Sequence, residues 1–188
     1  MRKLSFLIAL CTLLTVGGVY ATWTYMETTN VADETIHMSL NLGNVEFAGS
    51  YGQYIVDASG VKMTIDPKEG TTHTTALYVT GDLVIKFTPN ANAPQTVKDS
   101  GVASTFKFAL STKTNWLYEE EKLLTLHEED PHAITWQKQS DGSFTYTIPA
   151  VELAAHFDLK EFVLDTKAKY DAYNAVLGQI DVIVSDGQ

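Results

Sequence analysis

Cysteine is almost absent from this sequence. The 188 residues contain one, Cys11, and it lies in an apolar run near the N-terminus. The chain beyond residue 21 therefore has no disulfide and no thiolate zinc site. A domain without such cross-links depends on its hydrophobic core, and 45% hydrophobic with 19% charged residues is an ordinary composition for one globular domain.

Basic clusters are also lacking. The net charge is −10, from 13 Lys and Arg residues against 23 Asp and Glu residues. Arg2-Lys3 is the one cluster of basic residues in the chain. Binding of phosphates requires a basic patch, so the composition argues against a nucleic-acid partner.

The N-terminus has the organisation of an export signal. Arg2-Lys3 precedes the apolar run Leu4–Val16, and Gly17-Gly18 follows it. Glycines weaken a helix just before a site that a peptidase reads in extended form. Val19 and Ala21 then supply modest or small side chains at the two positions that a signal peptidase inspects.

We therefore predict cleavage after Ala21, which leaves Thr22 as the first residue of the mature chain. The predicted organisation is a signal peptide over residues 1–21 and a single domain over residues 22–188. The alternative is an N-terminal anchor that stays uncleaved, because the apolar stretch is close to the length of about 20 residues that spans a membrane.

Alternating apolar and polar residues predict several β-strands. The alternation runs from Thr35 to Leu42, from Thr105 to Leu110 and from Ile180 to Val184, and it places one face of each segment in a core. Gly43 is interpreted as a bulge, after which residues 45–47 resume the pattern.

Turn signals separate further short strands. Gly81-Asp82 and Ser140-Asp141-Gly142-Ser143 each predict a tight hairpin, and Ala58-Ser59-Gly60 predicts a turn. The strands on either side of these three turns cover residues 54–56, 61–65, 76–80, 83–88, 134–136 and 144–148.

Two segments have helical patterns. Thr166–Leu177 brings apolar and aromatic side chains to one side, with Asp165 as the N-cap and Gly178 as the stop. Ala150–Phe157, after Pro149, is a second short helix. Strands and helices do not alternate regularly, so the pattern predicts a mainly β fold, an antiparallel β-sandwich with one or two helices inserted before the last strand.

The start of the chain resembles that of the TasA/camelysin family. The resemblance rests on Val16-Gly17-Gly18-Val19-Tyr20-Ala21, on Thr22-Trp23-Thr24-Tyr25 after it, and more weakly on residues 31–43. It implies a jelly-roll-like sandwich that a Gram-positive bacterium exports with the help of a SipW-type signal peptidase. It further implies a secreted structural protein of the cell surface or biofilm matrix, whose partners are its own copies or related matrix subunits, with no cofactor.

Family members form fibres in which the N-terminal segment of one subunit adds as a strand to the next. Backbone groups at an open sheet edge pair with an extended peptide, and alternate side chains fill pockets. The candidate donor strand here is Thr22–Val31, where Trp23 and Tyr25 lie on the opposite face from Thr22 and Thr24. The alternative is a flexible terminus, or an edge strand of its own domain.

The resemblance also raises an enzymatic role, because camelysins have been described as metallopeptidase-like. Zinc peptidases of the His-Glu-x-x-His type need two histidines four residues apart on one helix face. His127 and His132 are five apart, and Pro131 disrupts a helix there. We expect a solvated acidic loop, with Glu128, Glu129, Asp130 and His132 available for at most an adventitious cation.

No residue is assigned as catalytic, cofactor-binding or metal-binding. The chain has no Gly-x-Ser-x-Gly nucleophile elbow. Glu119-Glu120-Glu121 is interpreted as a solvated face, and His37, His73 and His156 as surface or cap residues. Besides the structural role, the sequence leaves open a monomeric ligand-binding or adhesion module, and a camelysin-like metallopeptidase as a third hypothesis.

Overall fold

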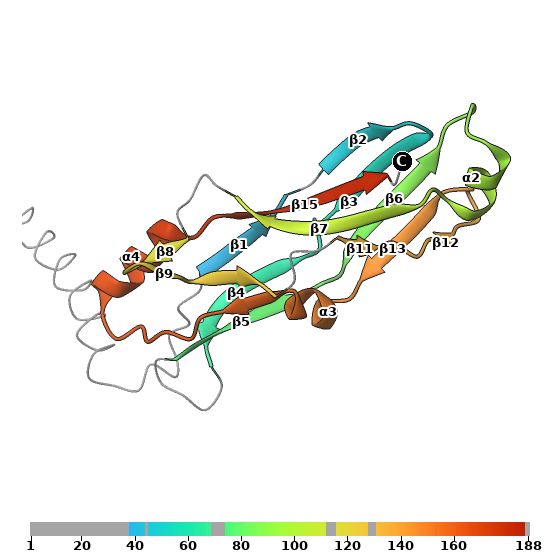
Figure 1. The fold of residues 1–188 in the computed structure, drawn as a ribbon. Coiled ribbons are helices and arrows are strands. Elements are labelled where there is room, and N and C mark those ends of the chain that lie inside the picture. The colour runs from blue at the N-terminus through green and yellow to red at the C-terminus, as the bar shows by residue number, and fades with distance from the viewer. Residues whose placement is uncertain (1–37, 44, 69–73, 112–115, 128–130, 187–188) are drawn as a thin grey trace, which may run out of the picture.

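The computed structural model describes residues 38–43, 45–68, 74–111, 116–127 and 131–186 (Figure 1). This part of the chain is mainly β, with three helices, and almost all of its strand pairs are antiparallel. The exception is the parallel pair of β1 and β15. The helices are α2 (Gln95–Ser100), α3 (Ala150–Ala155) and α4 (Lys167–Val176). The strands are β1 (Met38–Leu42), β2 (Val45–Gly49), β3 (Gly52–Asp57), β4 (Lys62–Pro67), β5 (Thr75–Thr80), β6 (Leu83–Pro89), β7 (Ser104–Leu110), β8 (Leu117–Tyr118), β9 (Glu121–Lys122), β10 (Leu124–Leu126), β11 (His132–Ala133), β12 (Gln137–Lys138), β13 (Phe144–Ile148), β14 (Phe157–Leu159) and β15 (Gln179–Asp186).

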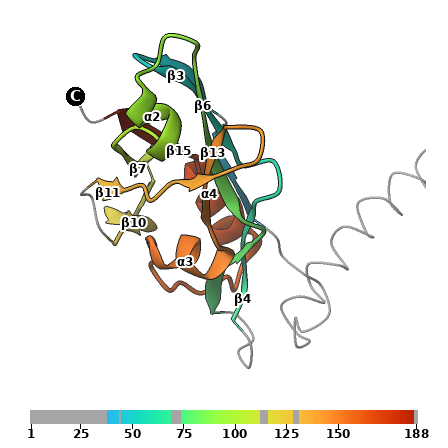
Figure 2. The same ribbon diagram turned by 90° about the vertical axis from the view of Figure 1, so that its right-hand side faces the viewer.

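Two sheets contain most of these strands. One has the order β11-β7-β15-β1-β4-β5, and the other has the order β12-β13-β6-β3-β2. The part formed by β1, β4 and β5 curls as a half-barrel. Two small ladders, β10-β14 and β8-β9, complete the described strands. Buried side chains from both large sheets belong to one hydrophobic cluster, so the sheets share a core (Figure 2).

The alternation of apolar residues correctly predicts the buried faces of the strands. In β7, Phe106 and Phe108 are buried, and in β15 the same holds for Ile180, Val182 and Val184. These two strands pair along the whole of β7, from Ile180 opposite Leu110 to Asp186 opposite Ser104. Side chains at alternate positions thus face the core, as the period of two requires.

The hairpin predicted at Gly81-Asp82 is wrong, although strands lie on both sides of it. β5 pairs with β4 in one sheet, whereas β6 pairs with β3 and β13 in the other. Residues 58–61 in the same way connect β3, in the five-stranded sheet, to β4, in the six-stranded sheet. The two-stranded ribbon that consists of β3–β4 and β5–β6 therefore turns a corner from one sheet to the other. At the corner, a Cβ added to Gly81 would lie 2.0 Å from the carbonyl oxygen of Gly60.

The bulge interpreted at Gly43 is also wrong, because β1 and β2 belong to different sheets. The backbone N–H of Gly43 donates to the carbonyl of Ile180 at 3.1 Å. A Cβ at this position would lie 2.6 Å from Nε2 of Gln179. Gly43 thus ends β1 against β15, and the chain then crosses to pair with β3. A local pattern of alternation cannot distinguish a bulge from a change of sheet.

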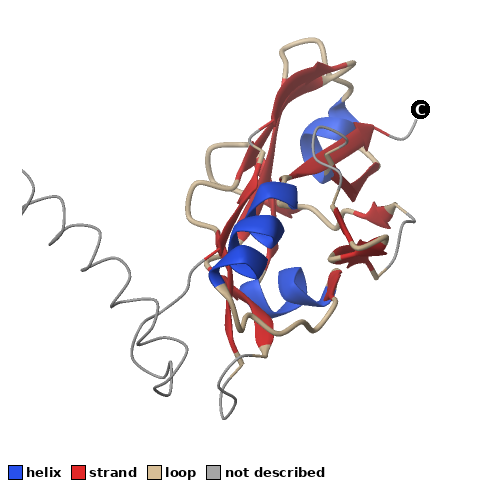
Figure 3. Cartoon of the chain, turned by 90° about the vertical axis from the view of Figure 1, so that its left-hand side faces the viewer, coloured by secondary structure: helices blue, strands red, loops and turns tan. Residues whose placement is uncertain are grey.

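The two predicted helices are present, with small differences at their ends. α4 begins one residue later than expected, because Thr166 Oγ1 accepts the cap hydrogen bond from the N–H of Lys169 at 3.3 Å. Asp165 instead forms an ion pair with Lys169. The short helix α2 was not predicted from the sequence. No helix in the described part of the chain combines the length and the apolar composition needed to cross a membrane (Figure 3).

The hairpin predicted at residues 140–143 is confirmed. β12 pairs with β13, with Lys138 opposite Phe144, so its first strand starts after the predicted residues 134–136. Asp141 orders the turn, because one carboxylate oxygen accepts from the N–H of Ser143 at 2.9 Å and from its hydroxyl at 2.6 Å. These hydrogen bonds, with the nearby Lys86, hold the pKa of Asp141 below its usual value of 3.8.

Asp141→Asn is therefore expected to lower the melting temperature at pH 7 and to lower it less at pH 2. A depressed folded-state pKa stabilises the fold above the unfolded value of 3.8, and this contribution disappears as the pH falls through the folded pKa. Thermal unfolding followed by circular dichroism at both pH values measures the effect. A difference from the unsubstituted protein that is equally large at both pH values would contradict this account.

Candidate functional site

The open edges of the two sheets are the sites where another strand could pair. The six-stranded sheet ends at β11 and at β5, and α3 packs against β5. The five-stranded sheet ends at the two-residue strand β12 and at β2. Among the described residues, β2 has a strand partner only on the side of β3.

A further open edge lies inside the six-stranded sheet, along the second half of β7. One edge of β7 pairs with β15 throughout its length. The other edge pairs with β11 only at Thr105 and Phe106, because β11 is two residues long. Within the described part of the chain, Lys107–Leu110 therefore has no strand partner on that side.

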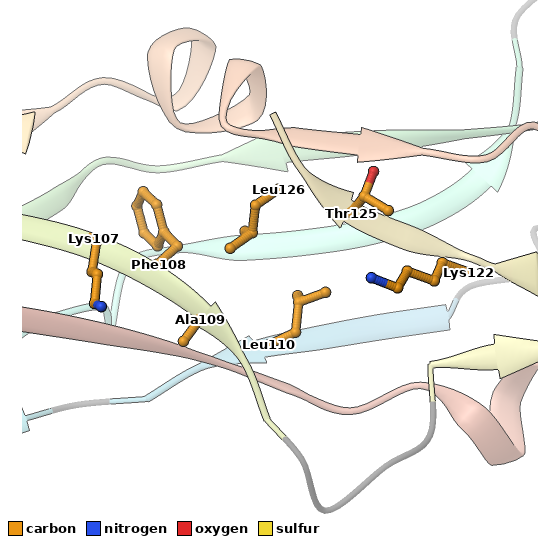
Figure 4. A pocket seen from close by; sticks show the side chains of 7 residues that line it. All are labelled: Lys107, Phe108, Ala109, Leu110, Lys122, Thr125 and Leu126. Atoms are coloured by element: carbon orange, nitrogen blue, oxygen red, sulfur yellow. The ribbon is translucent and has the colours of Figure 1, made fainter. Parts of the chain in front are cut away.

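A slot of about 420 Å³ opens beside this unpaired half of β7, between β7 and β10. We call it the β7–β10 slot (Figure 4). Phe108 is buried, and Leu110 and Leu126 are half-buried, so the inner wall of the slot is apolar. Lys107 and Lys122 are exposed. The residues that line the slot are Lys107, Phe108, Ala109, Leu110, Lys122, Thr125 and Leu126.

The far side of the slot is the small ladder of β10 and β14. Leu124 lies opposite Leu159 and Leu126 opposite Phe157 in this ladder. β10 approaches β7 to within 8 Å between Cα atoms. A strand inserted between two neighbours needs them about 10 Å apart, so the ladder would have to move outward by at least about 2 Å.

Three aromatic contacts support the wall of the slot from behind. The ring of His132 stacks on Phe106 at 5.2 Å between centroids, and His156 lies edge-on to His132 at 4.7 Å. His156 also contacts Phe108 at 4.9 Å. These two histidines thus pack in the aromatic cluster that holds Phe108 in place. His156 is the C-cap residue of α3, in agreement with the cap role predicted for it.

The histidines do not form a metal site with other described residues. His127 Nδ1 lies 3.0 Å from Asp158 Oδ2, at the end of the β10–β14 ladder, whereas His132 belongs to β11. In the described ranges, no three His, Cys, Asp or Glu side chains are grouped so that they could hold a metal ion. The remaining residues proposed for an adventitious cation, residues 128–130, lie outside the described ranges.

A second depression, of about 630 Å³, lies over the end of β2, β3 and β6. Across these three strands, Gln53 of β3 lies between Ala48 of β2 and Thr88 of β6. In the next row, Gly52 lies between Gly49 and Pro89. The lining has no aromatic or large aliphatic side chain: it consists of Glu46, Ala48, Gly49, Gly52, Gln53, Thr88, Pro89 and Asn90. Among the side chains that the structure describes there, it therefore offers hydrogen-bonding groups and no apolar anchor.

The site residues named from the sequence lie outside the described ranges. They are Val19, Ala21, Thr22, Trp23 and Tyr25, together with His37 and His73. The acidic run at residues 119–121 forms the exposed turn between β8 and β9, which agrees with a solvated face.

The β7–β10 slot itself was missed by sequence reasoning. Thr105–Leu110 was recognised as a strand, but the pattern of one strand does not tell which of its edges lacks a partner. That depends on the lengths of β11 and β10, which are two and three residues.

Comparison of the chain with protein-family models, with curated proteins and with solved structures finds no match.

Proposed function

We propose that this chain is exported and serves as a structural protein of the cell surface or biofilm matrix, which assembles by strand addition. In this proposal Thr22–Val31 of one mature subunit is the donor strand, and the β7–β10 slot of the next subunit is the acceptor. A SipW-type peptidase removes residues 1–21, and the partners are other copies or related matrix subunits. No enzymatic activity and no cofactor belong to the proposal.

The observation that carries it is an edge of Lys107–Leu110 that has no strand partner among the described residues, beside an apolar slot. Main-chain hydrogen bonds supply affinity when a strand is added, and pockets for alternate side chains supply specificity. The β7–β10 slot offers both, since Phe108, Leu110 and Leu126 line it. The edge of β2 offers backbone groups, but the described side chains that line the depression beside it include no aromatic or large aliphatic one, so we infer that it is the weaker acceptor.

The architecture that suits this role is a jelly-roll-like sandwich, which we infer from two features. Both large sheets contribute to one hydrophobic cluster. In addition, the ribbon of β3–β4 with β5–β6 passes from one sheet to the other at the corner of Gly60 and Gly81. Ribbons that fold over in this way are typical of jelly rolls.

Removing residues 22–31 is expected to abolish polymers. The chain that begins at Thr22 is incubated at high concentration and examined by negative-stain electron microscopy beside a chain that begins at Ala32. Ordered fibres are expected only from the longer chain, because the shorter one lacks the donor strand. Circular dichroism of both proteins controls for loss of folding. Fibres from the shorter chain, or monomers from both, would overturn strand addition by this segment.

A monomeric ligand-binding or adhesion module is the second candidate function. The depression over β2, β3 and β6 favours it, because its volume lies within the range of about 300 to 1,000 Å³ that is usual for small-molecule sites. Gln53, Thr88 and Asn90 supply polar groups there. This candidate predicts a monomer whose ligand binding does not depend on residues 22–31, so the same pair of proteins separates the two functions.

A further inference from the structure

The open edge of β2 lacks the features that keep sheet edges from pairing with other strands. Exposed edges are usually protected by a proline, a lysine, a bulge or a covering element. The sequence of β2, Val-Glu-Phe-Ala-Gly, has no proline and no lysine. Its register with β3 runs through five consecutive residue pairs without a bulge. Another strand can therefore pair with β2 on the side away from β3.

The other open edges in the described part of the chain are shorter or covered. β11 and β12 are two residues long, whereas β2 has five residues. α3 packs against β5, and β10 approaches the unpartnered half of β7 to within 8 Å between Cα atoms. β2 lies at the margin of the molecule (Figure 1). Within the described ranges, β2 is thus the edge that an already formed strand can reach without displacing another element.

The two faces of β2 show that its edge is separate from the contact with the other sheet. Glu46 and Ala48 are exposed and share one face, because side chains two residues apart in a strand point the same way. Gly49 belongs to the opposite face, where a carboxylate oxygen of Asp186 would lie 2.9 Å from an added Cβ. β15 of the other sheet therefore lies under β2 at this point and not beside it.

We propose that β2 pairs antiparallel with β2 of a second copy, which joins two five-stranded sheets into one continuous sheet. The second copy is the partner that fits, because it supplies a strand of equal length with an equally open edge, and a single two-fold axis satisfies both. Both strands are already ordered in their own sheets, so the pairing does not need an apolar pocket to order a flexible donor. The inference goes beyond the proposed function, since it does not involve residues 22–31.

The charge of β2 selects the register of this pairing. A two-fold axis at Phe47 pairs all five residues of β2, and it places Glu46 of each copy opposite Ala48 of the other. An axis at Glu46 would pair fewer residues and would set the two carboxylates directly opposite each other, which destabilises a sheet. The expected dimer therefore has two Glu46–Ala48 pairs.

The first test is disulfide cross-linking in the chain that begins at Thr22. Residues 22–188 contain no cysteine, so Glu46→Cys and Ala48→Cys each introduce a single thiol. Directly opposite residues have Cβ atoms about 4.5 to 5.5 Å apart, close to the distance that a disulfide spans. A mixture of the two variants is expected to form the heterodimer at least about fivefold faster than either variant alone forms a homodimer, because identical positions are offset by two residues. Glu46→Cys mixed with Ala155→Cys is the control.

The second test changes the charge opposite Glu46. Sedimentation equilibrium at low salt measures the dimer Kd of Ala48→Glu, of Ala48→Lys, and of Glu46→Lys combined with Ala48→Glu. Each variant is made in the chain that begins at Thr22 and in the chain that begins at Ala32, and circular dichroism confirms that it is folded. Ala155→Glu is the matched control, because Ala155 is also an exposed alanine and lies on α3, which packs against β5.

Ala48→Glu is expected to raise the Kd about tenfold, because it creates two pairs of like charges directly opposite each other. Ala48→Lys is expected to lower the Kd about threefold or more, since each lysine then faces a glutamate. The combined variant should return to within about threefold of the unsubstituted chain or bind more tightly, and Ala155→Glu should stay within about twofold. High salt should reduce all these differences, because it screens exposed charges.

Three results would overturn the pairing of β2 with β2. One is a monomer at every concentration in both chains. Another is an effect of Ala48→Glu no larger than that of Ala155→Glu. The third is a dimer of the chain that begins at Thr22 but not of the chain that begins at Ala32, which would mean that residues 22–31 occupy the edge. Fibres that depend on residues 22–31, beside a dimer that does not, would support strand addition and the β2 pairing separately.

Discussion

Replacing Gly81 with alanine is expected to lower the free energy of unfolding by about 2 to 5 kcal/mol. Gly81 has a φ of +78°, a left-handed conformation that costs a residue with a Cβ about 1 to 2 kcal/mol. The new Cβ would also lie 2.0 Å from the carbonyl oxygen of Gly60. Relief of this clash requires backbone movement at the corner between the sheets, and such overpacking costs about 1 to 3 kcal/mol more.

Two other glycines are matched controls for Gly81→Ala. Gly142 has a φ of +82° with nothing near its added Cβ, so Gly142→Ala measures the conformational cost alone, about 1 to 2 kcal/mol. A Cβ added to Gly60 would have no atom within 4 Å, and the φ of Gly60 is not positive. Gly60→Ala should therefore change the free energy of unfolding by less than about 0.5 kcal/mol. Urea unfolding of the three variants supplies the comparison. If Gly81→Ala and Gly142→Ala lower the free energy of unfolding equally, the contact of the new Cβ with Gly60 has no energetic cost.

Phe106→Ala is expected to lower the free energy of unfolding by about 3 to 5 kcal/mol. Phe106 is 1% exposed. Its ring meets Phe108 of β7 and His132 of β11 in one sheet, and Tyr146 of β13 in the other. Truncation therefore leaves a cavity between the sheets, since its neighbours are held by their own strands and can collapse only in part.

Urea unfolding of Phe106→Ala beside Val151→Ala provides the measurement. Val151 is 81% exposed on α3, so its truncation should change the stability by less than about 0.5 kcal/mol. A loss below about 1.5 kcal/mol for Phe106→Ala would mean that the sheets close over the missing ring, contrary to the packing described here.

The strands were largely predictable because each one obeys a local rule. Phe106 and Phe108, or Ile180 and Val182, recur every second residue, and burial of one face enforces that spacing. The helix at residues 167–176 was predictable from the apolar and aromatic residues on one of its sides and from the stop at Gly178, although its cap is Thr166 and not the predicted Asp165. The short helix α2 contributes one buried residue, Val97, and has no side-chain cap hydrogen bond, so it left little signal in the sequence.

The assignment of strands to sheets was not predictable from local patterns. Gly81-Asp82 has the composition of a hairpin turn, yet it forms a corner, because β4 and β3 offer separate partners to the strands on either side. The candidate site follows from the same kind of information. Lys107 and Lys122 lie in different segments of the sequence, and only the tertiary structure brings them to one slot.

The parallel pairing of β1 with β15 has a mechanical consequence. These are the first and the last strands described, and Asn41 lies beside Gln179, with Leu42 beside Ile180. Tension applied between the two ends of the domain, as in a fibre of the proposed kind, pulls the parallel neighbours in opposite directions along their length. Their hydrogen bonds are then sheared together instead of being opened one after another, so the link between the two ends resists stretching more than a peeled hairpin would.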